Sequence, residues 1–129
     1  MDFNELVTKA RSILNSRRLS EEGWAGGVAA ALLTEDGNVY TGVCIDVTSG
    51  MGFCAEHAAI AAMVTAGENR ITKIVAVGEN GIMPPCGRCR EFISQIHDEN
   101  YKTRVMVADD VAVTIKELLP YDFKGKYLT

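Results

Sequence analysis

The sequence predicts an α/β sandwich in which helices cover both faces of a mixed sheet. Three observations predict it. The chain has 129 residues, 47% hydrophobic and 23% charged, which suits one soluble domain with one core. A hairpin signal is followed by helix and strand patterns that alternate along the chain. The strand expected at residues 71–77 shows little polar alternation, as expected when both its faces are covered. We therefore expect residues 1–129 to form a single domain.

The first half of the chain is predicted to contain one helix and one hairpin. Apolar residues recur at helical spacing after Asp2, which forms a capping box with Glu5. Glu35-Asp36-Gly37-Asn38 is a hairpin signal, and alanine-rich residues before it are assigned to a buried strand because of that signal. The predicted elements are a helix over residues 2–15, a polar connection over 15–22, strands over 28–33 and 39–45, and a loop over 47–53.

The second half alternates between helix and strand. Gly67 suits the C-terminal cap of the first of these helices. Thr114 and Glu117 form a capping box for a short last helix that Pro120 ends. The remaining predicted elements are helices over residues 54–66 and 86–97, a loop over 78–85, and strands over 71–77, 104–108 and 111–113.

Charge and hydropathy narrow the class of partner. The net charge is −4, from 13 basic and 17 acidic residues, which argues against a nucleic acid. No apolar run is long enough to span a bilayer, and the first residues lack a basic and then apolar leader. We expect a cytoplasmic protein with a small-molecule substrate and no membrane partner.

The residues that carry chemistry lie in two short segments, Cys54-Ala55-Glu56-His57 and Pro84-Pro85-Cys86-Gly87-Arg88-Cys89-Arg90. Each segment is predicted to open a helix, where exposed N–H groups and the helix dipole favour a thiolate. Three thiols that hold one zinc ion leave a fourth position open, as in catalytic zinc sites. Glu56 lies beside this site and is not needed as a ligand.

Two other interpretations of the cysteines remain open. Four cysteines without a predicted export signal are expected to be metal-bound or free. His57 or Cys44 would complete a closed, structural zinc site, and without metal all four thiols would be buried and free. The 28 residues between His57 and Cys86 exceed the spacers of compact zinc modules, about 12–20 residues.

A zinc ion with three thiolates carries a net charge of −1, and a nearby positive group would offset it. Arg88, between the two later cysteines, is the first candidate, and His57 is the second. The alternatives are that Arg88 is a surface residue of its helix and that His57 is a partly buried helix histidine.

At these segments the chain resembles the cytidine deaminase family, from about residue 28 to residue 123. The motif of Cys-x-Glu followed by Pro-Cys-x-x-Cys is the pattern of zinc deaminases. The matching stretches are Val28–Thr34 as the first strand, Cys54–Glu56 and Pro85–Arg90 as zinc motifs, and Glu117–Pro120 with Phe123 as the C-terminal motif.

The resemblance implies a three-layer α/β/α fold with a five-stranded sheet and one zinc ion per chain, bound by Cys54, Cys86 and Cys89. It implies hydrolysis of the amino group of a free cytosine nucleoside, with Glu56 as the proton shuttle to ring N3 and to the departing ammonia. It also implies a homotetramer, or a homodimer, whose sites neighbouring chains complete.

The chain departs from the family where the nucleoside's ribose would bind. Members that act on cytidine carry Asn and Glu where this chain has Cys44 and Asp46, which we assign with Ala55 to substrate binding. A thiol is a poor replacement for an amide. The family aromatic before the first strand is also absent, with Gly26 near its place.

These departures leave the substrate open. The short loop before Cys54 and the run Cys86–Arg90 are similar to the blasticidin S deaminase branch, which suggests a modified cytosine nucleoside as the alternative substrate. Trp24 would stack on a substrate or pack in the core or an interface. The aromatic residues that would line a neighbour's site or pack in the tail are Tyr121, Phe123 and Tyr127. A non-enzymatic oligomer stabilised by zinc is the alternative of a different class.

Overall fold

One sheet organises residues 1–124, the part of the chain that the computed structural model describes. Its five-stranded core has the order β3-β2-β4-β6-β7, and the short strands β1 and β5 pair beside β2 and β4. Only β4 and β6 pair in parallel among the described strands. The strands are β1 (Arg17–Ser20), β2 (Gly23–Thr34), β3 (Val39–Val47), β4 (Ile71–Gly78), β5 (Gly81–Met83), β6 (Arg104–Ala108) and β7 (Val111–Thr114).

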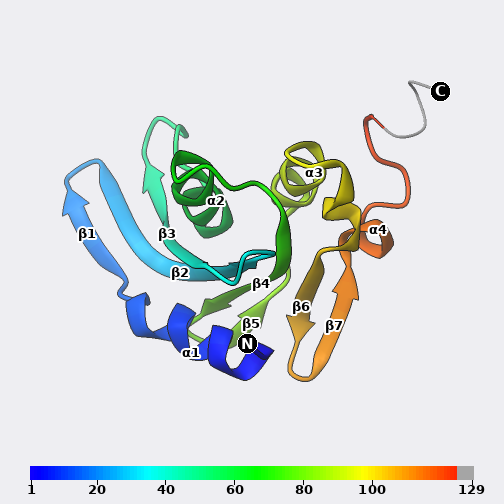
Figure 1. Cartoon of the computed structure of the whole chain (residues 1–129). Coiled ribbons are helices and arrows are strands. Elements are labelled where there is room, and N and C mark those ends of the chain that lie inside the picture. Colours follow the sequence, from blue (N-terminus) through cyan, green and yellow to red (C-terminus); the bar gives the residue numbers. More distant parts are fainter. Residues whose placement is uncertain (125–129) are drawn as a thin grey trace.

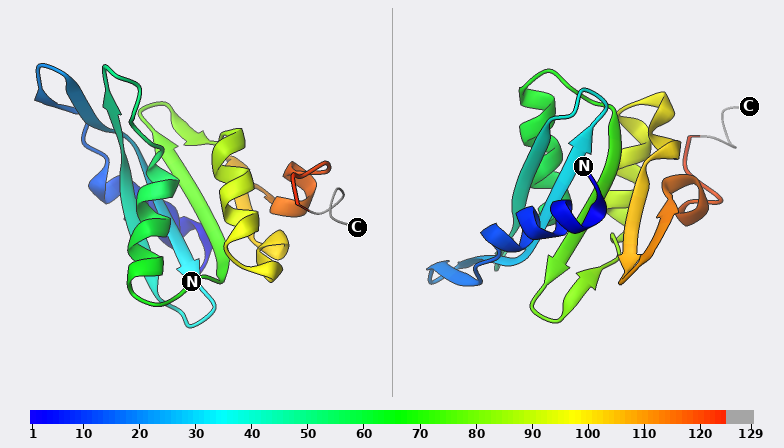
Figure 2. Two further views of the ribbon diagram at one scale, coloured as in Figure 1. Left: turned by 90° about the horizontal axis from the view of Figure 1, so that it is seen from above. Right: turned by 60° about the horizontal axis from the view of Figure 1, so that its bottom comes forward.

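Helices cover both faces of this sheet, so the predicted three-layer sandwich is confirmed (Figure 1). Helix α1 lies across one face, and α2 and α3 lie on the other (Figure 2). The short helix α4 contacts the edge strand β7, and a 3₁₀ helix, η1, contacts α3, α4 and β4. The helices are α1 (Phe3–Ile13), α2 (Ala55–Thr65), α3 (Gly87–Gln95), η1 (Asp98–Lys102) and α4 (Ile115–Leu118).

The two central strands are buried on both faces, which explains why their sequences do not alternate. Ala29 and Ala31 of β2 pack in the α1 layer, whereas Ala30 and Leu32 pack in the layer of α2 and α3. Strand β4 divides in the same way between the two layers. A strand that is buried on both faces favours an all-apolar sequence over an alternating one.

The close approach of α2 to the sheet depends on Gly42 of β3. A Cβ atom at this position would lie 2.4 Å from the backbone nitrogen of Ala59 and 2.6 Å from the Cβ atom of Ala58. Because nonbonded carbon atoms prefer about 3.5–4.0 Å, only glycine lets α2 lie this close to β3. The position of Gly42 therefore sets the position of the helix that carries Glu56.

The predicted capping residues are confirmed, although α1 and α3 each end two residues before the predicted position. Asp2 with Glu5 and Thr114 with Glu117 both form complete capping boxes. Gly67 follows the C-terminus of α2 with a φ of +95°, a conformation that favours glycine.

Several predicted boundaries were wrong. The polar connection over residues 15–22 contains β1, whose four residues are all exposed, so no apolar pattern marks it. The loop over 78–85 contains the three-residue strand β5. Strand β2 begins at Gly23, five residues before the predicted start. Within residues 1–124 no helix is long and apolar enough to cross a membrane.

Candidate metal centre and active site

The two motif segments form the N-termini of α2 and α3. Cys54 is the N-cap residue of α2, and Cys86 is the N-cap residue of α3. Neither side chain makes a capping hydrogen bond, so both sulfurs are free to face another group. Cys89 lies in the first turn of α3 and is fully buried. The local sequence thus brings three sulfurs to one point from two helix starts.

The geometry of the three sulfurs fits a zinc ion. The Sγ atoms of Cys54 and Cys86 are 3.4 Å apart, and those of Cys86 and Cys89 are 3.7 Å apart. All three lie within 4.8 Å of one another. A tetrahedral zinc ion with Zn–S bonds of about 2.3 Å separates its sulfurs by about 3.8 Å. In the described part of the chain, no His, Cys, Asp or Glu side chain joins this group as a fourth member.

The ionisation of the three thiols also favours a bound cation. Burial raises the pKa of the Cys54 thiol, and so does its Cys86 neighbour. Burial and the Glu56 carboxylate raise the pKa of Cys89. Burial acts to raise the pKa of Cys86 as well. Hydrogen bonds, among them one with the backbone N–H of Cys89, outweigh this effect and lower the pKa of Cys86. A divalent cation among the sulfurs relieves the cost of ionising all three.

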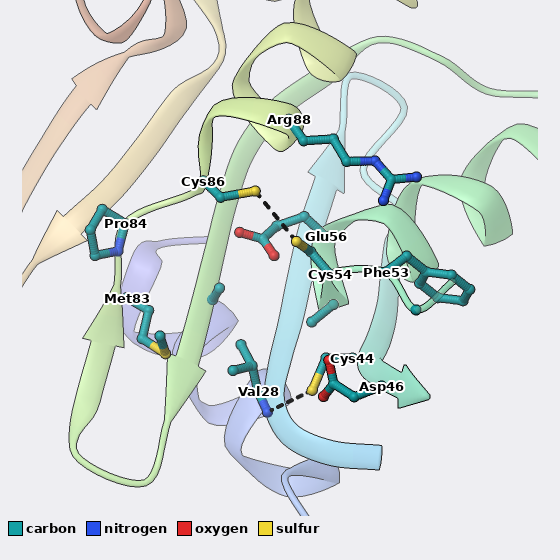
Figure 3. Close-up of a pocket in the computed structure, with 13 residues that line it drawn as sticks. Val28, Cys44, Asp46, Phe53, Cys54, Glu56, Met83, Pro84, Cys86 and Arg88 are labelled. Atoms are coloured by element: carbon teal, nitrogen blue, oxygen red, sulfur yellow. Dashed lines mark hydrogen bonds between the residues drawn. The ribbon is translucent and has the colours of Figure 1, made fainter. Parts of the chain in front are cut away.

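Glu56 lies in the second position of α2 and is only 5% exposed. Burial raises the pKa of its carboxyl group, while its own backbone N–H and the Cys89 thiol act in the opposite direction. Figure 3 shows the carboxylate beside the sulfurs of Cys54 and Cys86. A buried carboxyl group with a raised pKa beside a metal site is suited to general acid–base chemistry.

A cavity of about 340 Å³ opens beside the sulfurs and Glu56. This volume is within the range of roughly 300–1,000 Å³ for small-molecule sites. Cys54, Cys86 and Glu56 lie at one end of it, and Cys44 and Asp46 of β3 lie at the other (Figure 3). The remaining lining residues are Val28, Gly52, Phe53, Ala55, Ala76, Met83, Pro84 and Arg88.

The sequence-predicted substrate residues therefore share the cavity with the predicted metal ligands. The Cys44 sulfur accepts a hydrogen bond of 3.3 Å from the backbone N–H of Val28. Asp46 is exposed at the end of β3 and pairs in register with Trp24 of β2. Ala55 is fully buried at the start of α2. Trp24 is 42% exposed and is not among the lining residues.

The two predicted charge-balancing residues take different positions. His57 Nδ1 lies 3.3 Å from the Cys89 sulfur, and its ring stacks on Phe92 with a centroid separation of 4.5 Å. Burial lowers the pKa of His57, and the charge of Arg88 lowers it further. Arg88 is exposed and lines the cavity. The contact with a sulfur is thus made by the second candidate, His57.

Two residues that the sequence did not mark as functional hold the elements around the site together. Arg90 of α3 donates hydrogen bonds to the backbone carbonyl of Pro85, just before α3, and to that of Leu118 in α4. The fully buried Asn100 side chain bonds the backbone of Ile71 in β4 and of Ile93 in α3. Arg90 and Asn100 bond backbone atoms, most of them in other elements, so no local sequence pattern identifies these two residues. Tyr121 and Phe123 are exposed, and Tyr127 lies outside the described residues.

Comparison with known proteins places this site in a family. A family model described as the cytidine and deoxycytidylate deaminase zinc-binding region matches residues 4–105. The chain is 33% identical over 134 residues to a cytidine deaminase of Sporosarcina psychrophila, covering 100% of this chain and 96% of that protein. It is 32% identical over 106 residues to a blasticidin-S deaminase of Bacillus cereus, covering 74% and 76%.

A cytidine deaminase of Mycobacterium tuberculosis is similar in sequence and structure. The sequences are 38% identical over 68 residues, which is 51% of this chain and 51% of that protein. The matched stretch thus spans about half of that relative. Its crystal structure superposes with a TM-score of 0.79 and 27% identity, covering 95% of this chain and 98% of the other. The family model, the fold and the three-cysteine zinc site agree, and the chain belongs to the cytidine and deoxycytidylate deaminase family.

Proposed function

We propose that the protein is a zinc-dependent aminohydrolase that converts a free cytosine nucleoside and water into the uracil nucleoside and ammonia. The observation that carries the proposal is the buried Glu56 carboxylate, which lines the same cavity as Cys54 and Cys86. When bound by the cysteines, zinc supplies the Lewis acidity that makes water a nucleophile near neutral pH. Cytidine and deoxycytidine are the expected substrates, because the family and several relatives are named for this activity.

Glu56 is proposed to move the protons. Its carboxylate takes a proton from the attacking water and delivers it to ring N3 of the base. It then passes the second water proton to the 4-amino group, which leaves as ammonia. The raised pKa of Glu56 suits this role, because a group that must both accept and release protons works best with a pKa near the working pH.

The other predicted site residues complete the proposal. The base lies at the end of the cavity near Glu56, and the sugar lies toward Cys44 and Asp46. Asp46 accepts from a sugar hydroxyl, and Ala55, buried at the start of α2, closes the wall beside the base. Arg88 offsets the negative charge of the three thiolates, and the ring of His57, whose lowered pKa keeps it neutral near pH 7, lies within hydrogen-bond distance of the Cys89 sulfur.

The partners follow from the same features. A net charge of −4 favours a free nucleoside over a nucleic acid. We propose self-association into a homotetramer or homodimer, because α2 leaves the apolar residues Ala61, Ala62 and Val64 exposed, Val64 by 50%. Four free cysteines in the described residues support a reducing, cytoplasmic location.

A second candidate is a deaminase of a modified cytosine nucleoside such as blasticidin S. Two observations favour it: the 32% identity to a blasticidin-S deaminase, and Cys44 and Asp46 at the sugar end of the cavity. The non-enzymatic alternative needs a fourth protein ligand, and His57 and Cys44 both lie outside the group of three sulfurs.

The test is ammonia release by zinc-loaded protein from cytidine, deoxycytidine and blasticidin S, measured in parallel. Turnover of the first two supports the main proposal. Turnover of blasticidin S alone supports the second candidate. Zinc-loaded protein that releases ammonia from none of the three contradicts both.

A further inference from the structure

Arg90 connects the start of its own helix to the C-terminal part of the fold. Its Nε–H donates to the backbone carbonyl of Pro85 at 2.8 Å, and its Nη1–H donates to the carbonyl of Leu118 at 3.3 Å. The first carbonyl belongs to the residue before Cys86. The second belongs to the last residue of α4. Arg90 itself follows the buried Cys89 in α3.

The three sulfur ligands differ in what holds their backbones. Cys54 follows Phe53, whose N–H and carbonyl both pair with Ile45 of β3 at 2.9 and 3.1 Å. Cys89 is fixed within the first turn of α3. Cys86 is the exposed ligand. Its carbonyl accepts the backbone N–H of Arg90 at 3.1 Å on the helix side, so on the other side its position depends on the chain that leads to it.

That chain is poor in hydrogen bonds of its own. Pro84 and Pro85 have no N–H group to donate, and Cys86 makes no side-chain capping bond. The bond from Arg90 holds the Pro85 carbonyl, one residue from the ligand. Residues that orient metal ligands from outside act through such bonds.

The Leu118 carbonyl gives the guanidinium its orientation. A carbonyl at a helix C-terminus has no partner within the helix and attracts a cation. The planar guanidinium has several N–H groups at fixed angles, so one group bonds Leu118 while another bonds Pro85. The C-terminal helix thereby fixes the guanidinium against the loop that carries Cys86.

We propose that Arg90 is a positioning residue of the zinc site, which holds Cys86 in place through the Pro85 carbonyl and is itself oriented by Leu118. The proposal concerns zinc affinity and rests on the three-cysteine site. It does not depend on which nucleoside is deaminated, so its failure and the failure of the proposed function are distinguishable.

The experiment measures the zinc dissociation constant of the full chain by competition with a coloured chelator. Arg90→Met removes both bonds and retains an apolar stem, and we expect zinc binding about tenfold weaker, the lower end for loss of an outer partner of a metal site. Arg104→Met is the matched control, because Arg104 of β6 also donates to a backbone carbonyl, that of Ala112 at 3.4 Å, but on the hairpin of β6 and β7. The control is expected to keep wild-type zinc affinity.

Spectroscopy of the cobalt-substituted protein gives a readout that a general loss of stability does not change. A displaced Cys86 sulfur alters the thiolate-to-cobalt charge-transfer band of Arg90→Met but not that of Arg104→Met. Arg90→Lys keeps the positive charge but loses the planar guanidinium, so its zinc affinity is expected to fall severalfold. If Arg90→Met does not fold, the zinc affinity and cobalt spectrum of Arg90→Lys test the proposal instead. Wild-type zinc affinity and an unchanged cobalt spectrum in the variant that folds would overturn the proposal.

Discussion

Substitution of Gly42 by alanine is the sharpest test of how the fold positions the site. The new Cβ atom would lie 2.4 Å from the nitrogen of Ala59, whereas contact requires about 3.5 Å. The difference, 3.5 − 2.4, requires α2 to move away from β3 by about 1 Å. That helix carries Glu56 in its first turn, and Cys54 is its N-cap residue.

The expected losses follow from this displacement. Overpacking of this kind costs about 1–3 kcal/mol, and each kcal/mol lowers the melting temperature of a domain of this size by about 4 °C. A displacement of about 1 Å at catalytic groups costs up to about 100-fold in rate. We therefore expect Gly42→Ala to melt about 4–12 °C lower and to lose about 10- to 100-fold in kcat.

The assay is ammonia release at saturating substrate by zinc-loaded protein, together with thermal melting. Gly23→Ala is the matched control, because its Cβ atom would meet its nearest neighbours at 3.6 Å, an ordinary contact. If Gly42→Ala has the kcat and the melting temperature of Gly23→Ala, the argument that Gly42 positions α2 is wrong.

Three further outcomes are expected. Cys86→Ser should abolish stoichiometric zinc binding in a chelator assay, since it removes one of the three sulfurs, and full zinc content in this variant would count against the ligand set. Asn100→Ala should lower the free energy of unfolding in urea by about 2–4 kcal/mol, because the buried N–H of Ile71 and carbonyl of Ile93 lose their partner; a loss below about 1 kcal/mol would refute this role. Hydrogen bonds to Glu68 from Thr34 and Tyr40 lower its pKa from 4.5, so the carboxylate stabilises the fold above that pH and this stability is lost as pH falls through the lowered value. The gap in urea midpoint between wild type and Glu68→Gln should therefore be widest above pH 4.5, and a gap that widens in acid would contradict the sign.

The metal ligands and the acid–base residue could be predicted from the sequence because they lie only two or three positions apart within each motif. The interval between Cys86 and Cys89 and that between Cys54 and Glu56 are set within one helical turn. Helix periodicity and capping residues marked α1 and α4 for the same reason. Local rules suffice where the partner of a residue lies three or four positions away.

The rest depends on partners that are distant along the chain. Strand β1 is fully exposed and exists only through pairing with β2, so its sequence has no apolar alternation. Arg90 and Asn100 act on backbone atoms of other elements. The contact of His57 with Cys89 joins two helices, and spacing alone favoured Arg88 for that position.

The central claim is that Glu56 moves protons and does not hold the metal. The most direct measurement is kcat for cytidine deamination by Glu56→Gln beside its zinc content, with the exposed Glu99→Gln as control. The account predicts one zinc ion per chain in all three proteins and a loss of about 10²–10⁴-fold in kcat for Glu56→Gln alone. Zinc loss from Glu56→Gln, or activity within about tenfold of wild type, would contradict it.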